Sequence, residues 1–179
     1  MNIQPSQRVQ QIKEYYFSTK LKEIAALRSR GIDIISLGIG GPDLPPPSGV
    51  ITTMAEAVHD PSNHGYQPHV GVPQLREAFA RWYGRWYGVE VDPLTEIQPL
   101  IGSKEGVTHI SLAFLNPGDK VLIPDPGYPT YSSISRMAGA EVVTYDLTED
   151  SGWQPDFDAI ERLDLTRVKL MWLNYPHMP

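Results

Sequence analysis

The stretch Ile97-Gln98-Pro99-Leu100-Ile101-Gly102-Ser103-Lys104-Glu105-Gly106 reads as a short apolar strand, a turn of small residues and the start of a helix. We predict a strand over 97–101 and a helix from about residue 105 to 115. The first N–H groups of a helix have no partner within the helix, and the helix dipole is positive there, so such a turn can bind an anion. Two interpretations are open: a phosphate site, in which Gly102 permits close approach and Ser103 donates a hydrogen bond, or an ordinary strand-to-helix turn.

Strand-like and helix-like segments alternate along the chain. The run 168–173 is almost continuously apolar, which is typical of a strand buried on both faces. The alternation predicts an α/β layered fold with a mostly parallel sheet and flanking helices. The remaining expected strands are 33–37, 120–124 and 141–145. The remaining expected helices are 12–30 (one amphipathic helix or two short ones), 48–58 (with Ser48 as its cap), 73–87, 131–137 and 155–163.

Three loops follow predicted strands of this sheet. They contain Gly102-Ser103, Asp125-Pro126-Gly127-Tyr128 and Asn174-Tyr175-Pro176. Ligands of parallel sheets bind beyond the carboxyl ends of the strands. We therefore expect these loops to converge on one site, which favours the phosphate interpretation of the first.

Composition excludes several classes of protein. The chain has 179 residues and a net charge of −6 without a basic run, so nucleic-acid binding is not expected. The absence of cysteine excludes disulfides and thiolate chemistry, and no metal site is predicted. No apolar run approaches the roughly 20 residues of a membrane span, and residues 1–11 lack a signal-peptide core. A soluble cytoplasmic protein without membrane partners is expected.

Aromatic side chains recur at helical spacing in the expected helix 73–87. We interpret this stripe as core or subunit interface rather than as a binding site. Its members are Leu75, Phe79, Trp82, Tyr83 and Trp86.

Several motifs, in one order, resemble those of a known family. Residues 102–106 (Gly-Ser-Lys-Glu-Gly), 115–119 (Leu-Asn-Pro-Gly-Asp) and 124–131 (Pro-Asp-Pro-Gly-Tyr-Pro-Thr-Tyr) resemble the class I/II aminotransferases, which are pyridoxal-phosphate enzymes of fold type I. The upstream segments 37–43 and 66–77 extend the resemblance over nearly the whole chain. It is strongest to the branch that contains LL-diaminopimelate, alanine and aspartate aminotransferases.

The resemblance implies a domain organisation. Residues 1–47 would form an N-terminal arm and part of the small domain. Residues 48–179 would form the first part of the pyridoxal-phosphate-binding large domain, which is incomplete here.

The resemblance also implies cofactor contacts. Gly102, Ser103 and Lys104 would hold the phosphate of pyridoxal 5′-phosphate, and Tyr128 would stack on its ring. Tyr66 would reach the phosphate bound by the partner of a homodimer. The alternatives are a solvated Lys104, a buried loop tyrosine at 128 and a surface aromatic at 66.

One further position concerns the substrate. Gly40 matches the glycine whose backbone contacts the substrate carboxylate, and its alternative is a plain turn glycine.

The end of the chain departs from the family pattern. The family reads Asn-Pro-Thr-Gly after its strand, with the asparagine bonded to the ring oxygen of the cofactor. Here residues 174–179 read Asn-Tyr-Pro-His-Met-Pro, so that Met178 takes the place of this asparagine. A thioether donates no hydrogen bond, so this contact is expected to be lost, and the adjacent His177 is not expected to replace it.

The covalent lysine, the aspartate at the pyridine nitrogen and the substrate arginine all come later in the family. Lys104 and Lys169 do not lie in the lysine motif, so no catalytic residue is assigned. We expect a fragment, a truncated product or half of a site completed by another chain. The 179 residues alone are predicted not to transaminate.

The resemblance thus implies the N-terminal portion of an aminotransferase, which moves an amino group between an amino acid and a 2-oxo acid. Two alternatives stay open. One is a fold-type-I lyase, either a carbon–sulfur lyase or one like aminocyclopropane-carboxylate synthase. The other is a non-catalytic, truncated phosphate-binding or dimerisation domain.

Overall fold

The computed structural model describes residues 3–10, 14–38 and 40–178. These residues form two compact units, one from the described parts of 1–14 and 100–179, the other from those of 15–99. The expected division of the chain at residue 47 stays a prediction. Within the described ranges, no helix combines the length and apolar character needed to cross a bilayer.

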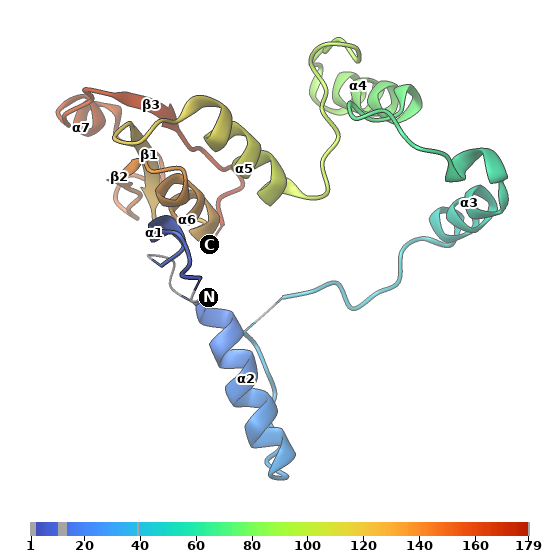
Figure 1. The fold of residues 1–179 in the computed structure, drawn as a ribbon, viewed down its shortest axis with the longest axis horizontal. Helices are drawn as coiled ribbons and strands as arrows, with labels where there is room; N and C mark the ends of the chain where they lie inside the picture. The colour runs from blue at the N-terminus through green and yellow to red at the C-terminus, as the bar shows by residue number, and fades with distance from the viewer. Residues whose placement is uncertain (1–2, 11–13, 39, 179) are drawn as a thin grey trace. The chain divides into compact units, whose positions relative to one another are not determined.

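The first unit contains a parallel sheet (Figure 1). Its strands are β1 (Lys120–Asp125), β2 (Glu141–Asp146) and β3 (Val168–Met171). The order is β2-β1-β3, so that β1 pairs with both neighbours and the other two form the edges. The predicted parallel sheet is therefore present, although β3 is an edge strand and only partly buried rather than buried on both faces.

Helices flank this sheet. α5 packs against α6, and α6 contacts β1 and β2. The predicted helices over 105–115 and 131–137 are confirmed, while the helix expected over 155–163 is shorter. The helices of this unit are α1 (Gln7–Gln10), α5 (Ser103–Phe114), α6 (Pro129–Met137) and α7 (Phe157–Glu161).

The core lies on both faces of β1, because successive side chains of a strand point to opposite faces. Val121 and Ile123 pack on one face with residues of α5 and α6, whereas Leu122 packs on the other with Ile160 of α7. Val121 is completely buried. Because the three strands are parallel, the loop that follows Asp125 lies at the same edge of the sheet as the carboxyl ends of β2 and β3.

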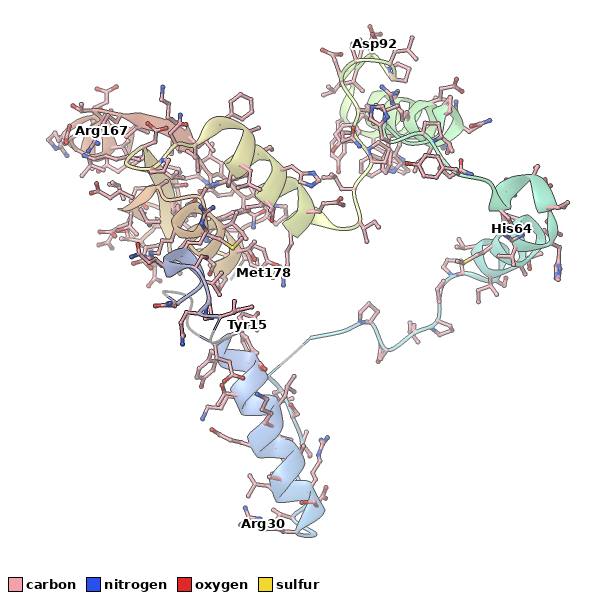
Figure 2. All side chains as sticks on the ribbon, in the orientation of Figure 1. Tyr15, Arg30, His64, Asp92, Arg167 and Met178 are labelled. Atoms are coloured by element: carbon pink, nitrogen blue, oxygen red, sulfur yellow. The ribbon has the colours of Figure 1, made fainter. Side chains whose placement is uncertain are left out.

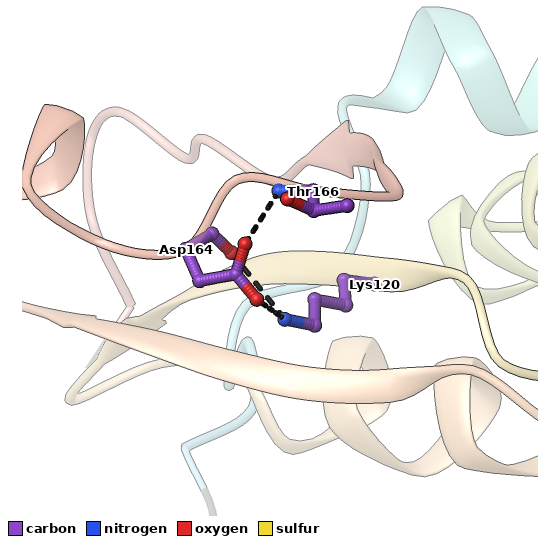
Figure 3. A network of polar contacts seen from close by, with 3 residues as sticks. All are labelled: Lys120, Asp164 and Thr166. Atoms are coloured by element: carbon purple, nitrogen blue, oxygen red, sulfur yellow. Dashed lines mark hydrogen bonds and ion pairs between the residues drawn. The ribbon is translucent and has the colours of Figure 1, made fainter.

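An ion pair stands at the opposite, N-terminal end of β1 (Figure 3). The Lys120 ammonium donates to an Asp164 carboxylate oxygen at 2.5 Å, and the Thr166 backbone N–H donates to the other oxygen at 3.0 Å. These hydrogen bonds hold the pKa of Asp164 well below its ordinary value. The bond from Lys120 has the largest effect, and those from Thr166 come next. The pair connects the segment before β3 to the start of β1.

The second unit is helical over much of its length. The Asp60 carboxylate accepts the Ser62 N–H at 2.9 Å at the start of η1, and Gly88 ends α4 with φ +64°. Its elements are α2 (Tyr16–Ser29), α3 (Ser48–His59), the 3₁₀ helix η1 (Pro61–His64) and α4 (Pro73–Tyr87).

The aromatic stripe of α4 is exposed in this chain. Its five side chains are each at least 40% accessible. The expectation that they form core is therefore wrong for the described residues, and the alternative of a subunit interface stays a prediction. Arg76, on the same helix, is buried instead and donates to the Leu94 carbonyl.

Four local expectations differ from the structure. No strand forms over 33–37 or 97–101, because no described segment pairs with either, and a strand requires a hydrogen-bonded neighbour. Ser48 is the first residue of α3 and makes no capping bond; Pro47 stands at the cap. The helix expected over 12–30 begins at Tyr16 in the described chain, and residues 12–13 lie outside the described residues.

Candidate functional site

The turn into α5 has the geometry of an anion site. Gly102 has φ +85°, a conformation that glycine adopts without steric cost, and nothing lies within 4 Å of where its Cβ would be. Ser103 is the first helical residue, and its hydroxyl makes no capping bond. Across the described residues, the N–H groups of Gly102 and Ser103 have no hydrogen-bond partner. Donors and open space therefore coincide at the positive end of a helix of 12 residues.

Glu105 is part of this turn and was not singled out by the sequence analysis. Its carboxylate accepts the Ile101 N–H at 2.6 Å, which satisfies the donor just before the turn. An acidic residue in the first helical turn was the available signal. The carboxylate thus leaves the Gly102 and Ser103 donors for another acceptor.

Tyr128 lies next to this turn, at the residue before α6. The Lys104 ammonium is 5.9 Å from the centre of the Tyr128 ring, so the structure brings the predicted phosphate loop and the predicted stacking residue together. The ring meets Tyr131 edge-on at 5.6 Å, and Tyr131 stacks on Trp172 at 4.9 Å and 7°. Burial, and then the neighbouring Tyr128, raise the pKa of Tyr131.

The loop after β3 reaches the same place. The His177 Nε2 atom lies 2.7 Å from the Pro126 carbonyl oxygen, within the loop that carries Tyr128. The three loops expected to converge therefore do meet in the first unit. Met178, for which the resemblance implies a departure from the family's asparagine, is 60% exposed in the segment that follows (Figure 2).

Two predicted site residues belong to the second unit. Tyr66 is fully exposed, and nothing lies within 4 Å of a Cβ built on Gly40. Their proposed contacts, with a partner's phosphate and with a substrate carboxylate, stay predictions. A fully exposed tyrosine side chain is compatible with a contact outside its own chain.

Comparison with known proteins decides the family. The model of the family described as aminotransferase class I and II matches residues 32–179. The chain belongs to the class I and II aminotransferases. Members of this family depend on pyridoxal phosphate, and the chain shares their α/β fold of type I, as its motifs predicted.

Curated aminotransferases align over nearly the whole chain. An LL-diaminopimelate aminotransferase of Moorella thermoacetica is 47% identical over 177 residues, which are 99% of this chain and 45% of the relative. One from Dehalococcoides mccartyi is 44% identical over 174 residues, with 97% and 45% covered. The chain thus spans a little under half the length of these relatives.

Solved aminotransferase structures share its fold. Apo-BacF from Bacillus subtilis superposes with a TM-score of 0.92 at 42% identity, covering 100% of this chain and 46% of that one. An aspartate aminotransferase mutant of Thermus thermophilus gives 0.89 at 29% identity, covering 99% and 46%.

Proposed function

We propose that this chain forms the N-terminal portion of a pyridoxal-phosphate-dependent aminotransferase, which moves an amino group between an amino acid and a 2-oxo acid. The observation that carries the proposal is the meeting of the α5 turn with Tyr128. Free backbone donors and an aromatic face suit a phosphate joined to a flat heteroaromatic ring.

The residues present fit most of the cofactor. The Gly102 and Ser103 N–H groups would bind phosphate oxygens, with the Ser103 hydroxyl as a further donor. Lys104 adds positive charge beside the Tyr128 ring, which would cover the pyridine face. Met178 does not fit, because its thioether cannot donate to the ring oxygen. When bound, pyridoxal phosphate supplies an electron sink for bond breaking at the α-carbon of an amino acid.

The partners are proposed on the same basis. We expect a homodimer in which Tyr66 contacts the phosphate held by the partner subunit and Gly40 contacts the substrate carboxylate. The relatives named LL-diaminopimelate aminotransferase make LL-diaminopimelate the amino-acid substrate to test first.

Cofactor affinity tests the proposal directly. Isothermal titration of the chain with pyridoxal phosphate and with pyridoxal measures the contribution of the phosphate. A hydrogen bond to a charged group contributes about 1.5–3 kcal/mol, so Ser103→Ala should weaken binding of the phosphate form about tenfold or more.

A second serine provides the matched control for this titration. Ser48 is also the first residue of a helix and also makes no capping bond, so Ser48→Ala should leave the affinity unchanged. Equal effects of the two substitutions, or equal affinity for the two ligands, would exclude a phosphate site at α5.

Met178 favours a second candidate, a non-catalytic phosphate-binding domain. Borohydride treatment with cofactor, followed by peptide mass spectrometry, tests this candidate. A single modified lysine argues against the non-catalytic domain. Reversible binding without modification is expected of both candidates, because no lysine of this chain lies in the lysine motif of the family. Met178→Asn, which restores a donor, should tighten binding in either case.

A further inference from the structure

The segment after β3 contacts the Tyr128 loop through one side chain. The His177 Nε2 atom is 2.7 Å from the Pro126 carbonyl oxygen, and Nδ1 is 3.2 Å from the Asn174 carbonyl oxygen. A neutral imidazole carries one N–H, and both neighbours are acceptors. The shorter contact assigns that hydrogen to Nε2, so His177 donates to Pro126.

The residue between Pro126 and Tyr128 has to be glycine. A Cβ on Gly127 would lie 2.2 Å from the Pro124 carbonyl oxygen. Glycine has the greatest backbone freedom of any residue, so its neighbours must determine the orientation of the Tyr128 ring. On the C-terminal side, Tyr128 is held by its ring contact with Tyr131 and by the start of α6. On the N-terminal side, the hydrogen bond from His177 holds the Pro126 carbonyl.

We propose that His177 is a positioning residue, which fixes the Pro126–Gly127 peptide and thereby aims the Tyr128 ring at the cofactor site. This inference rests on the proposed function. It gives a role to a side chain next to Met178, where the asparagine contact is missing. His177 acts through the loop backbone, and its ring nitrogens both face protein carbonyls.

A cavity beside His177 makes the residue suitable for substitution. It has a volume of about 580 Å³ and is lined by Pro126, Trp153, Tyr175 and His177, among others. Because this space is open to solvent, water can reach the Pro126 carbonyl when the imidazole is removed. Truncation should therefore release the loop without unfolding the sheet.

The test uses substitutions that separate the two ring nitrogens. The amide nitrogen of glutamine lies as many bonds from Cα as Nε2, whereas that of asparagine matches Nδ1. His177→Gln should therefore keep the donor to Pro126, while His177→Asn and His177→Ala should lose it. Tyr175→Phe is the control, because it removes a different hydrogen bond from the same segment, to the Trp153 carbonyl at 2.9 Å.

Two measurements are made on the full 179-residue chain. In ligand-free protein, the ¹⁵N order parameter of Gly127 should fall from about 0.85 toward about 0.6 in the alanine and asparagine variants. The dissociation constant for pyridoxal phosphate should rise about threefold to tenfold in the same two variants, as expected for one neutral hydrogen bond. The glutamine and phenylalanine variants should match the unsubstituted chain in both.

The outcomes separate this inference from the proposed function. An unchanged Gly127 order parameter in His177→Ala, or a glutamine variant as impaired as alanine, overturns the positioning role. A looser Gly127 with unchanged cofactor affinity overturns it as well. Absence of cofactor binding in the unsubstituted chain overturns the proposed function, and the order parameters then still decide whether His177 orders the loop.

Discussion

Replacing Gly127 by alanine tests how tightly the Tyr128 loop is determined. The new Cβ would stand 2.2 Å from the Pro124 carbonyl oxygen and 3.2 Å from the Pro124 carbonyl carbon, while ordinary contacts begin at 3.4 Å. The backbone must therefore move by about 1 Å, and overpacking of this kind typically costs about 1–3 kcal/mol. The clash arises from contact alone, because the backbone of Gly127 is not in the left-handed region.

Native-state hydrogen exchange at β1 amides measures this cost, since the slowest amides report the opening of the whole sheet. A loss of 1–3 kcal/mol accelerates their exchange about fivefold to 150-fold. Gly106→Ala is the matched control in the same unit. Its Cβ would approach the Leu100 Cδ1 atom to 2.6 Å, but Leu100 is 42% exposed and can rotate away.

The control should therefore be close to neutral, helped by the higher helix propensity of alanine in α5. Equal acceleration by the two substitutions would refute the reasoning, because it would show that a rigid backbone neighbour is no costlier than a mobile side chain. No acceleration in Gly127→Ala would show that the loop moves freely.

Three further outcomes follow from the same unit. Val121→Ala, at a completely buried position, should cost about 1.5–3 kcal/mol in urea unfolding, against less than about 0.5 kcal/mol for Val9→Ala at an exposed position of the same unit. Burial raises the pKa of Tyr145 to about 12, above its unfolded value of about 10, so its contribution to stability should be complete below pH 10 and lost as the pH rises from about 10 to 12; absorbance titration of phenolate checks this. The lowered pKa of Asp164 acts in the opposite sense: its contribution is present above about pH 4 and is lost as the pH falls below that, so Asp164→Asn should reduce stability at pH 7 and flatten the acid-side loss in unfolding curves measured between pH 7 and pH 3.

The local sequence pattern predicted most strands and helices of the first unit. The segments 120–124 and 141–145 became strands because their neighbours lie close in sequence and pair in parallel. The segments 33–37 and 97–101 have the same apolar character, but no described segment pairs with them, and sequence pattern carries no information about an absent partner. The α4 stripe illustrates the same limit, because periodicity identifies an apolar face but not what covers it.

The candidate site was predictable where motif and topology agreed. Gly102, Ser103 and Tyr128 meet because strand ends of a parallel sheet share one edge. Glu105 and His177 were missed as contributors, since both act through backbone groups. The hydrogen bond of His177 leaves no mark in residue type or spacing, whereas Glu105 had one signal, its place as an acidic residue in the first helical turn.

The stacked pair of Tyr131 and Trp172 gives the chain a built-in optical reporter. Trp82, Trp86 and Trp153 are 45%, 64% and 49% exposed, so we expect their emission to lie at longer wavelength than that of a buried indole. Trp172 lies parallel to the Tyr131 ring, and its indole nitrogen is buried without a hydrogen-bond partner among the described residues. We therefore expect Trp172 to dominate the short-wavelength edge of the fluorescence spectrum and the three exposed tryptophans to dominate the long-wavelength edge. A ligand that binds beside Tyr128 should quench the short-wavelength emission and leave the long-wavelength emission unchanged.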